Sequence, residues 1–283
     1  MTRYLIAGAN GQLGHDLQKA LAGRDVAAFG HAELDVTDLQ AVREASRGYD
    51  VILNASAYNK VDEAEEQESV AHAVNATGAH NLAIAASEVR AKLIHVSTDY
   101  VFDGTARSPY SENAMRSPIS AYGRTKAEGE RLALEANPER TYVVRTAWLY
   151  GSGGTNFAKT MVKLAASHDT VSVVDDQRGQ PTWTGDLAAQ IVALLDADAP
   201  TGIYHGTNSG ETTWFGFAQA IFTEAGLDPA RVLPTTSAEF VRPAPRPNYS
   251  VLGHDAWTAA GLAPMRGWRE ALADAAGAGA ITP

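Results

Sequence analysis

The chain has 283 residues, of which 45% are hydrophobic and 20% are charged, a balance typical of a globular protein with one large or two smaller domains. Its formal net charge of −10 argues against a nucleic-acid partner, because a phosphate backbone attracts basic surfaces. Cysteine is absent, which excludes disulfides and thiolate chemistry.

The sequence predicts no membrane association. No apolar run reaches the length of a transmembrane helix, and the chain passes directly into an apolar strand without a charged-then-apolar signal segment. We therefore expect a cytoplasmic protein.

The first predicted element is an apolar strand over residues 4–7, followed by the spacing Gly8-x-x-Gly11-x-x-Gly14 and a helical pattern. Glycine permits a tight turn and lets backbone N–H groups approach a ligand. The helix N-terminus then offers free donors and a partial positive charge to a pyrophosphate. Such a pattern alone also fits an ordinary strand–turn–helix. At the start of an alternating strand/helix chain it predicts a dinucleotide site.

The second predicted strand, residues 26–29, ends in Gly30-His31. An acidic residue there would bind the adenosine ribose and an arginine would bind a 2′-phosphate. Neither is present, so the sequence does not separate NADPH from NADH. Residues 35–38 follow, with an N-cap for the next helix at Thr37 or Asp38. Asp35 and Val36 either belong only to this cap segment or also lie beside the adenine.

A buried strand over residues 49–54 ends in the small residues 55–57, which would let a cofactor lie against the backbone. Lys60 follows and is interpreted as a surface lysine. The acidic residues 63–68 are interpreted as a solvated face or a helix start. A long helix is expected over residues 70–89.

The fourth predicted strand, residues 91–96, ends in Ser97-Thr98-Asp99-Tyr100. Polar residues at the carboxyl end of a parallel strand lie where open α/β sheets bind ligands. The next helix, residues 120–135, carries Tyr122 and Lys126 four positions apart and so on one face. By itself this pair also fits an incidental surface pair.

A further strand with its exit loop is expected over residues 142–151, and strands at 171–174 and 202–206. Further helices are expected at 156–167, 186–195, 214–225 and 268–276. The alternation predicts an α/β fold, a Rossmann-type doubly wound parallel sheet with a smaller, mostly C-terminal substrate domain. We assign residues 1–155 and 170–211 to the dinucleotide-binding domain, and 156–169 and 212–283 to the substrate-binding domain.

Such a sheet brings together the carboxyl ends of its first, third and fourth strands. The glycine turn, Ser97-Thr98 and Tyr122-x-x-x-Lys126 would then surround one crevice. In this order these motifs resemble the extended short-chain dehydrogenase/reductases. Further segments resemble, over nearly the whole chain, the dTDP-4-dehydrorhamnose reductase family: residues 61–65, 97–104, 122–130, 145–150, 156–161, 176–182 and 212–214.

The resemblance implies reduction of the C4 keto group of a 4-keto-6-deoxy-L-sugar nucleotide by NADPH or NADH, giving dTDP-L-rhamnose. Tyr122 would donate the proton. A free tyrosine has a pKa of about 10, and a nearby lysine ammonium favours the phenolate and lowers that value. Lys126 would also hold the nicotinamide ribose, and Thr98 would donate a hydrogen bond to the carbonyl oxygen.

The catalytic residues expected are Thr98, Tyr122 and Lys126. The cofactor residues expected are Gly8, Gly11, Gln12, Leu13, Gly14, Asp35, Val36, Ala55, Ala57, Tyr58, Asn59, Tyr122 and Lys126. The substrate residues expected are Val61, Thr98, Asp99, Tyr100, Tyr122, Trp148, Asn156 and Arg246. Arg246 is either near the nucleotide diphosphate, where a guanidinium suits phosphate, or a surface arginine.

Alternatives remain open from the sequence. The chain could reduce a related deoxysugar nucleotide, or it could be a non-catalytic regulatory relative, against which the intact motifs argue. No histidine cluster has metal-ligand spacing, so no metal site is predicted; Mg²⁺ bound by carboxylates such as Asp16 or Asp186 is possible without support from the sequence. The chain is expected to be a monomer or a homodimer whose partner is a small dTDP-keto-sugar.

Overall fold

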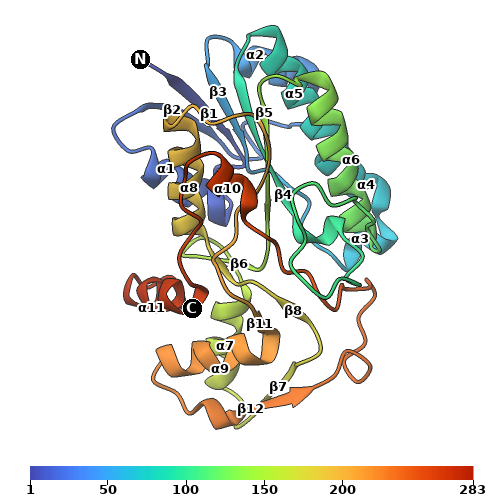
Figure 1. The fold of residues 1–283 in the computed structure, drawn as a ribbon, viewed down its shortest axis with the longest axis vertical. Coiled ribbons are helices and arrows are strands. Elements are labelled where there is room, and N and C mark those ends of the chain that lie inside the picture. The colour runs from blue at the N-terminus through green and yellow to red at the C-terminus, as the bar shows by residue number, and fades with distance from the viewer. Residues whose placement is uncertain (283) are drawn as a thin grey trace.

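A computed structural model describes residues 1–282, in which a six-stranded sheet layer lies above a smaller lobe (Figure 1). All strands of this sheet are parallel, in the order β10-β5-β4-β3-β1-β2. The strands are β1 (Arg3–Ala7), β2 (Asp25–Phe29), β3 (Val51–Asn54), β4 (Lys92–Thr98), β5 (Thr141–Thr146) and β10 (Gly202–His205). The expected doubly wound sheet is confirmed, and β1, β3 and β4 are neighbours.

Helices cover both faces of the sheet. One face carries α1 (Gln12–Ala20), α8 (Thr184–Asp196) and α10 (Asp255–Ala259), and the other carries α2 (Leu39–Ser46), α5 (Ala79–Glu88) and α6 (Ala121–Ala136). Alternate residues of β1 enter two separate cores: Tyr4 and Ile6 pack with Leu17, whereas Leu5 packs with Leu82. Because β1 is buried on both faces, its residues from Tyr4 to Ala7 are all apolar, and this continuous apolar run made the strand recognisable in the sequence.

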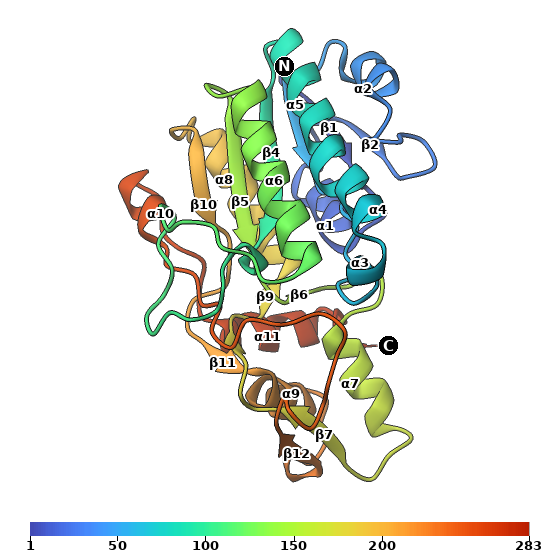
Figure 2. The same cartoon turned by 90° about the vertical axis from the view of Figure 1, so that its right-hand side faces the viewer.

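The smaller lobe is built from segments far apart in the chain (Figure 2). Its elements are α7 (Phe157–Ala165), β7 (Val171–Val174), α9 (Trp214–Glu224), β12 (Val232–Thr235) and α11 (Trp268–Gly277). Short pairs join the lobes: β6 (Leu149–Tyr150) with β9 (Thr182–Trp183), and β8 (Arg178–Gly179) with β11 (Thr212–Thr213). Single 3₁₀ turns lie at Asp99–Val101 and Pro229–Arg231.

Two segments lie on the other side of the expected boundaries. Strand β7 pairs with β12 and packs into the core of the smaller lobe, although residues 170–174 were assigned to the dinucleotide-binding part. Trp257 and Met265 pack under the main sheet, although residues 212–283 were assigned to the substrate-binding part. Strand pairing with β12 places β7, and packing under the sheet places Trp257 and Met265. These contacts join residues distant in sequence, so the periodicity of the sequence does not reveal them.

The segment expected as one helix over residues 70–89 has a different form. It consists of α4 (Glu68–His72), a π-helical turn (Ala73–Gly78) and α5. The acidic residues before it include α3 (Glu63–Glu66) and have defined partners: Glu65 accepts a hydrogen bond from the Ala121 N–H, and Glu68 pairs with Arg124. These carboxylates therefore connect the segment to the start of α6 rather than forming only a solvated face. Within residues 1–282, none of the helices is both long and apolar enough to span a bilayer.

Candidate active site

A cavity of about 680 Å³ lies at the carboxyl ends of β1, β3, β4 and β5, and α9 of the smaller lobe also contributes to its wall. Its lining contains most of the expected site residues: Gly8, Gly11, Gln12, Leu13, Asp35, Val36, Ala55, Ala57, Tyr58, Asn59, Val61, Thr98, Asp99, Tyr100, Tyr122, Lys126 and Trp148. Lining residues that the sequence did not single out are Asn10, His31, Leu34, Val74, Val96, Thr146, Ala147, Leu149 and Trp214.

The three glycines of the turn have different surroundings. Gly8 has φ +86°, and a Cβ there would lie 2.6 Å from the Ser56 nitrogen. A Cβ on Gly14 would lie 2.2 Å from the Gly8 carbonyl oxygen, so both positions require glycine for packing. At Gly11 the nearest atom to an added Cβ is 3.3 Å away. Gly11 is therefore the position where a side chain would compete with a ligand.

Helix α1 begins directly after this turn, and Gly11 at its N-cap provides no side-chain acceptor. The first backbone N–H groups of a helix have no partner within the helix and carry a partial positive charge. Together with the glycine turn they form a site suited to a pyrophosphate, so the residues fit the dinucleotide implied by the sequence.

At the adenosine end, Asp38 caps α2 as expected. The Asp35 carboxylate accepts hydrogen bonds from the backbone N–H of Thr37 at 2.9 Å and from its hydroxyl at 2.8 Å, and these hydrogen bonds lower the pKa of Asp35. Val36 and His31 also line this end of the cavity. The cap residue is thus close to the cavity residues Asp35 and Val36, whose contact with an adenine stays a prediction.

The π-helical turn holds Asn75, which sequence reasoning missed. Its buried side chain accepts from the Tyr58 N–H at 2.8 Å and donates to the Tyr58 carbonyl and to the Thr125 hydroxyl, each at 3.1 Å. A Cβ on Gly129 would lie 2.1 Å from the Asn75 carbonyl oxygen. Asn75 therefore fixes Tyr58 at the cavity wall against α6. A helix interrupted at a functional site is typical of π-helical turns.

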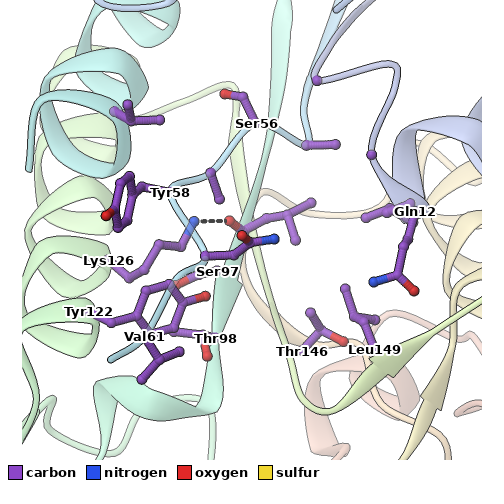
Figure 3. Close-up of a pocket in the computed structure, with 18 of the residues that line it drawn as sticks. Gln12, Ser56, Tyr58, Val61, Ser97, Thr98, Tyr122, Lys126, Thr146 and Leu149 are labelled. Atoms are coloured by element: carbon purple, nitrogen blue, oxygen red, sulfur yellow. Dashed lines mark hydrogen bonds between the residues drawn. The ribbon is translucent and has the colours of Figure 1, made fainter. Parts of the chain in front are cut away.

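Thr98, Tyr122 and Lys126 meet at one side of the cavity (Figure 3). The Lys126 Nζ donates to the Val96 carbonyl oxygen at 2.6 Å, and the side chain is 2% exposed. Burial lowers the pKa of Lys126 to about 8, and the charge of Glu130 opposes that effect. An ammonium has three donors, so Lys126 retains donors for ribose hydroxyls.

The pKa of Tyr122 differs from the expectation. Burial raises the pKa of Tyr122 to about 12, while its hydrogen bond with Thr98 opposes the rise. Lys126 is not among the groups that shift it, and its ammonium donates to the Val96 carbonyl oxygen. The prediction that Lys126 lowers the pKa of Tyr122 is thus wrong for this structure. The side chain is instead kept as a neutral phenol, the form that can donate a proton.

Asp99 and Tyr100 complete this side of the cavity. The Thr98 hydroxyl donates to the Asp99 Oδ1 at 3.0 Å, and Tyr100 meets the ring of Tyr122 edge-on with the centroids 5.6 Å apart. Burial raises the pKa of Tyr100, so its hydroxyl remains protonated.

An aromatic wall closes the end of the cavity next to the smaller lobe. Trp148 has the left-handed backbone angle φ +47° and stacks on Trp214 with ring centroids 3.7 Å apart. A Cβ on Gly179 would lie 2.7 Å from the Trp148 ring, so glycine is needed there to make room for the indole. The flat apolar surface fits the C–H face of a sugar ring. Trp214 was not predicted because the sequence does not show that its ring stacks on Trp148.

Three expected residues do not line this cavity. Gly14 packs beneath the glycine turn. Asn156 caps α7 and donates to the Gln12 Oε1 at 3.0 Å, so it reaches the cavity only through Gln12. Arg246 pairs with Asp62 at 2.9 Å and lines a second cavity of about 340 Å³. Asn59 and Val61 line both cavities.

The two carboxylates considered for Mg²⁺ have protein partners. Asp16 accepts from the Thr184 hydroxyl at 2.5 Å and pairs with Lys19 at 3.0 Å, and Asp186 pairs with Arg266 at 2.9 Å. Residues 1–282 contain no group of three or more histidine, aspartate or glutamate side chains arranged to hold a metal ion. Lys60 lies on the surface and pairs with Glu63, as interpreted from the sequence.

Comparison with known proteins shows consistent similarity. Residues 2–279 match the family model described as RmlD substrate binding domain. The chain is 50% identical over 280 residues to a dTDP-4-dehydrorhamnose reductase from Streptomyces griseus, covering 96% of this chain and 92% of the relative. It is 49% identical over 277 residues to a dTDP-4-keto-6-deoxy-D-glucose reductase from Streptomyces niveus, covering 96% of each.

The fold is also similar to that of solved structures. The crystal structure of a dTDP-4-dehydrorhamnose reductase from Bacillus anthracis in complex with NADP superposes with a TM-score of 0.94 at 39% identity, covering 97% of this chain and 99% of the other.

Proposed function

This chain belongs to the RmlD substrate-binding-domain family, and on that premise we propose that it reduces the C4 keto group of dTDP-4-dehydro-L-rhamnose to give dTDP-L-rhamnose, with NADPH or NADH as the reductant. The observation that carries this proposal is the convergence of Thr98, Tyr122 and Lys126 on the cavity that also contains the glycine turn. We place the reaction in the cytoplasm.

The side chains have complementary roles in this reaction. When bound, the reduced dinucleotide supplies a hydride to the carbonyl carbon, and negative charge develops on the carbonyl oxygen. Tyr122, which burial keeps protonated, donates its phenolic proton to that oxygen. Thr98 donates a hydrogen bond to the same oxygen. Lys126 is anchored by the Val96 carbonyl, and its remaining N–H groups would hold the ribose hydroxyls of the bound dinucleotide.

We further propose that the two lobes bind different molecules. The sheet layer holds the dinucleotide, and the smaller lobe with Trp214 closes over the sugar. Relative to the boundaries expected from the sequence, residues 170–174 move to the substrate-binding part and residues 255–265 to the dinucleotide-binding part. Arg246 remains a proposed contact for the nucleotide diphosphate through the second cavity, where its pairing with Asp62 holds the guanidinium in place.

A second substrate is favoured by one specific observation. The relative from Streptomyces niveus, named as a dTDP-4-keto-6-deoxy-D-glucose reductase, is almost as similar as the one from Streptomyces griseus. Oxidation of NADPH should therefore be measured with both keto-sugar nucleotides, and the C4 configuration of each product determined by NMR. Turnover with either one excludes the non-catalytic alternative.

The proposed proton donor is tested by Tyr122→Phe, which removes one hydroxyl and preserves the ring. We expect the rate of the chemical step to fall by about 10²–10⁴-fold, because an aligned general acid is lost, while dinucleotide affinity stays near that of the unmodified protein. Tyr49→Phe, outside the lining of the cavity, is the matched control. A Tyr122→Phe protein that turns over as fast as this control would remove Tyr122 from the mechanism.

A further inference from the structure

The Asp99 carboxyl group has an unusual environment at the active site. Asp99 is 1% exposed and lines the main cavity. Its Oδ1 accepts from the Thr98 hydroxyl, whereas its Oδ2 is buried and has no hydrogen-bond partner among the described residues. The salt bridges found within residues 1–282 do not include it. Burial removes the hydration of this carboxyl group and no cation compensates, so burial favours the protonated form more than the nearby hydrogen-bond donors favour the ionised one.

Groups from several elements face Asp99. Burial raises the pKa of Asp99 to about 6, and hydrogen bonds with the hydroxyls of Ser250 and Thr98 oppose the rise. Tyr122 from α6 and Tyr100 are the titratable neighbours, and Asp99 raises the pKa of each. Arg246 lies beyond Tyr100 and is paired with Asp62. Both protonation states of Asp99 are therefore accessible close to neutral pH.

The Thr98 hydroxyl connects this carboxyl group to the reaction. A hydroxyl has a single hydrogen, and its oxygen already accepts from the Tyr100 N–H at 3.2 Å. When Asp99 is ionised it can only accept, so it takes the Thr98 hydrogen. When Asp99 is protonated it can donate to the Thr98 oxygen, which leaves the Thr98 hydrogen free to point at another acceptor.

We propose that Asp99 is a positioning residue that acts through Thr98: protonated Asp99 turns the Thr98 O–H toward the substrate's carbonyl oxygen, and ionised Asp99 withdraws it. The proposal rests on the ketoreduction proposed above. In the active form the proton lies on the carboxyl oxygen that faces Thr98, so that Asp99 donates and the Thr98 oxygen accepts. The switch changes only the direction of one O–H bond, so no backbone movement is needed.

The test is the pH dependence of NADPH oxidation in single turnovers, with enzyme in excess so that the chemical step is observed. Because the protonated form is active, the rate is lost as the pH rises through the pKa of Asp99. Between about pH 6 and about pH 8 the unmodified enzyme should slow by roughly 50-fold, as expected for one ionisation. Asp99→Asn cannot ionise, so its rate should vary by less than about threefold over the same range.

Two further variants separate this role from a structural one. Thr98→Val has no hydroxyl to redirect and should be slow and equally flat over that pH range. Asp103→Asn, whose carboxylate caps a nearby turn through Thr105, should keep the full pH dependence. A steep fall that persists in folded Asp99→Asn overturns the proposal. If Asp99→Asn does not fold or does not turn over, a steep fall in Thr98→Val overturns the proposal on its own.

A second readout needs no substrate or cofactor. Infrared difference spectra of the unliganded protein should show a protonated carboxyl band that titrates near pH 6, disappears in Asp99→Asn and shifts in Thr98→Val. Absence of this band overturns the inference whatever the enzyme reduces. Conversely, a normal band in a protein that turns over no keto-sugar nucleotide would refute the proposed reaction while leaving the titration of Asp99 in place.

Discussion

Replacing Glu130 by glutamine should destabilise the protein far more than an exposed charge would suggest. Glu130 is 0% exposed and accepts from Arg145 at 2.9 and 2.8 Å and from the Ser97 hydroxyl at 2.6 Å. Arg145 is itself 1% exposed, and its other partners are a backbone carbonyl and His205. The substitution leaves a buried guanidinium without its carboxylate, and removing one partner of such a pair typically costs about 3–5 kcal/mol.

The lower end of that range applies, because the glutamine oxygen still accepts one of these hydrogen bonds. For a chain of this size, about 3 kcal/mol corresponds to a fall in Tm of roughly 6–12 °C. The measurement is chemical denaturation, with the midpoint expected to move and the m-value to stay constant. Glu135→Gln is the matched control on the same helix: its pair with Arg131 is 60% exposed at the carboxylate and should contribute less than about 1 kcal/mol.

Equal shifts in the two variants would refute the reasoning, because burial would then have no effect on the strength of the pair. A second consequence can be measured on the active site. The charge of Glu130 raises the pKa of Lys126, so Glu130→Gln should lower it further below about 8. If charged Lys126 is required, activity is lost as the pH rises through its pKa. In the Asp99→Asn background, which lacks the titration of Asp99, Glu130→Gln should therefore move the alkaline limb of the pH profile to lower pH.

The remaining predictions concern the dinucleotide. Gly11→Val should weaken binding of the dinucleotide, measured by calorimetric titration, while leaving Tm nearly unchanged. Gly14→Ala should instead lower Tm, because its Cβ would lie 2.2 Å from the Gly8 carbonyl oxygen. Unchanged affinity in Gly11→Val would contradict the placement of the pyrophosphate. Gly30-His31 provides neither an acid nor an arginine, so kcat/KM for NADPH and NADH should differ by less than about 100-fold, or roughly 2.7 kcal/mol, and a much larger ratio would reveal a determinant elsewhere.

The sheet was predictable because its signals are local. Apolar runs, glycines and caps identified β1 to β5, and the parallel topology then brought the ends of β1, β3 and β4 together. Thr98, Tyr122 and Lys126 were identified through the family resemblance of the combined motifs, because the spacing of Tyr122 and Lys126 alone, which places them on one helix face, also fits an incidental surface pair.

The properties that depend on distant partners were not predictable. The sequence does not show that Trp214 stacks on Trp148, that Asn75 holds Tyr58, or that Asp62 holds Arg246. The pKa of Tyr122 was misjudged for the same reason, because burial by distant segments is the main cause that shifts it. Burial cannot be read from the spacing of Tyr122 and Lys126.

The dispersed make-up of the smaller lobe has a consequence for protein synthesis. Its core contains both Met161 of α7 and Leu272 of α11, which are about a hundred residues apart in the chain. At ribosomal rates, α11 is therefore synthesised on the order of 10 s after α7. The sheet face covered by α2, α5 and α6 is complete far earlier, since its core ends near Ala136. We therefore expect nascent chains arrested before α11 to contain an ordered sheet layer and a protease-sensitive remainder whose apolar residues are available to chaperones.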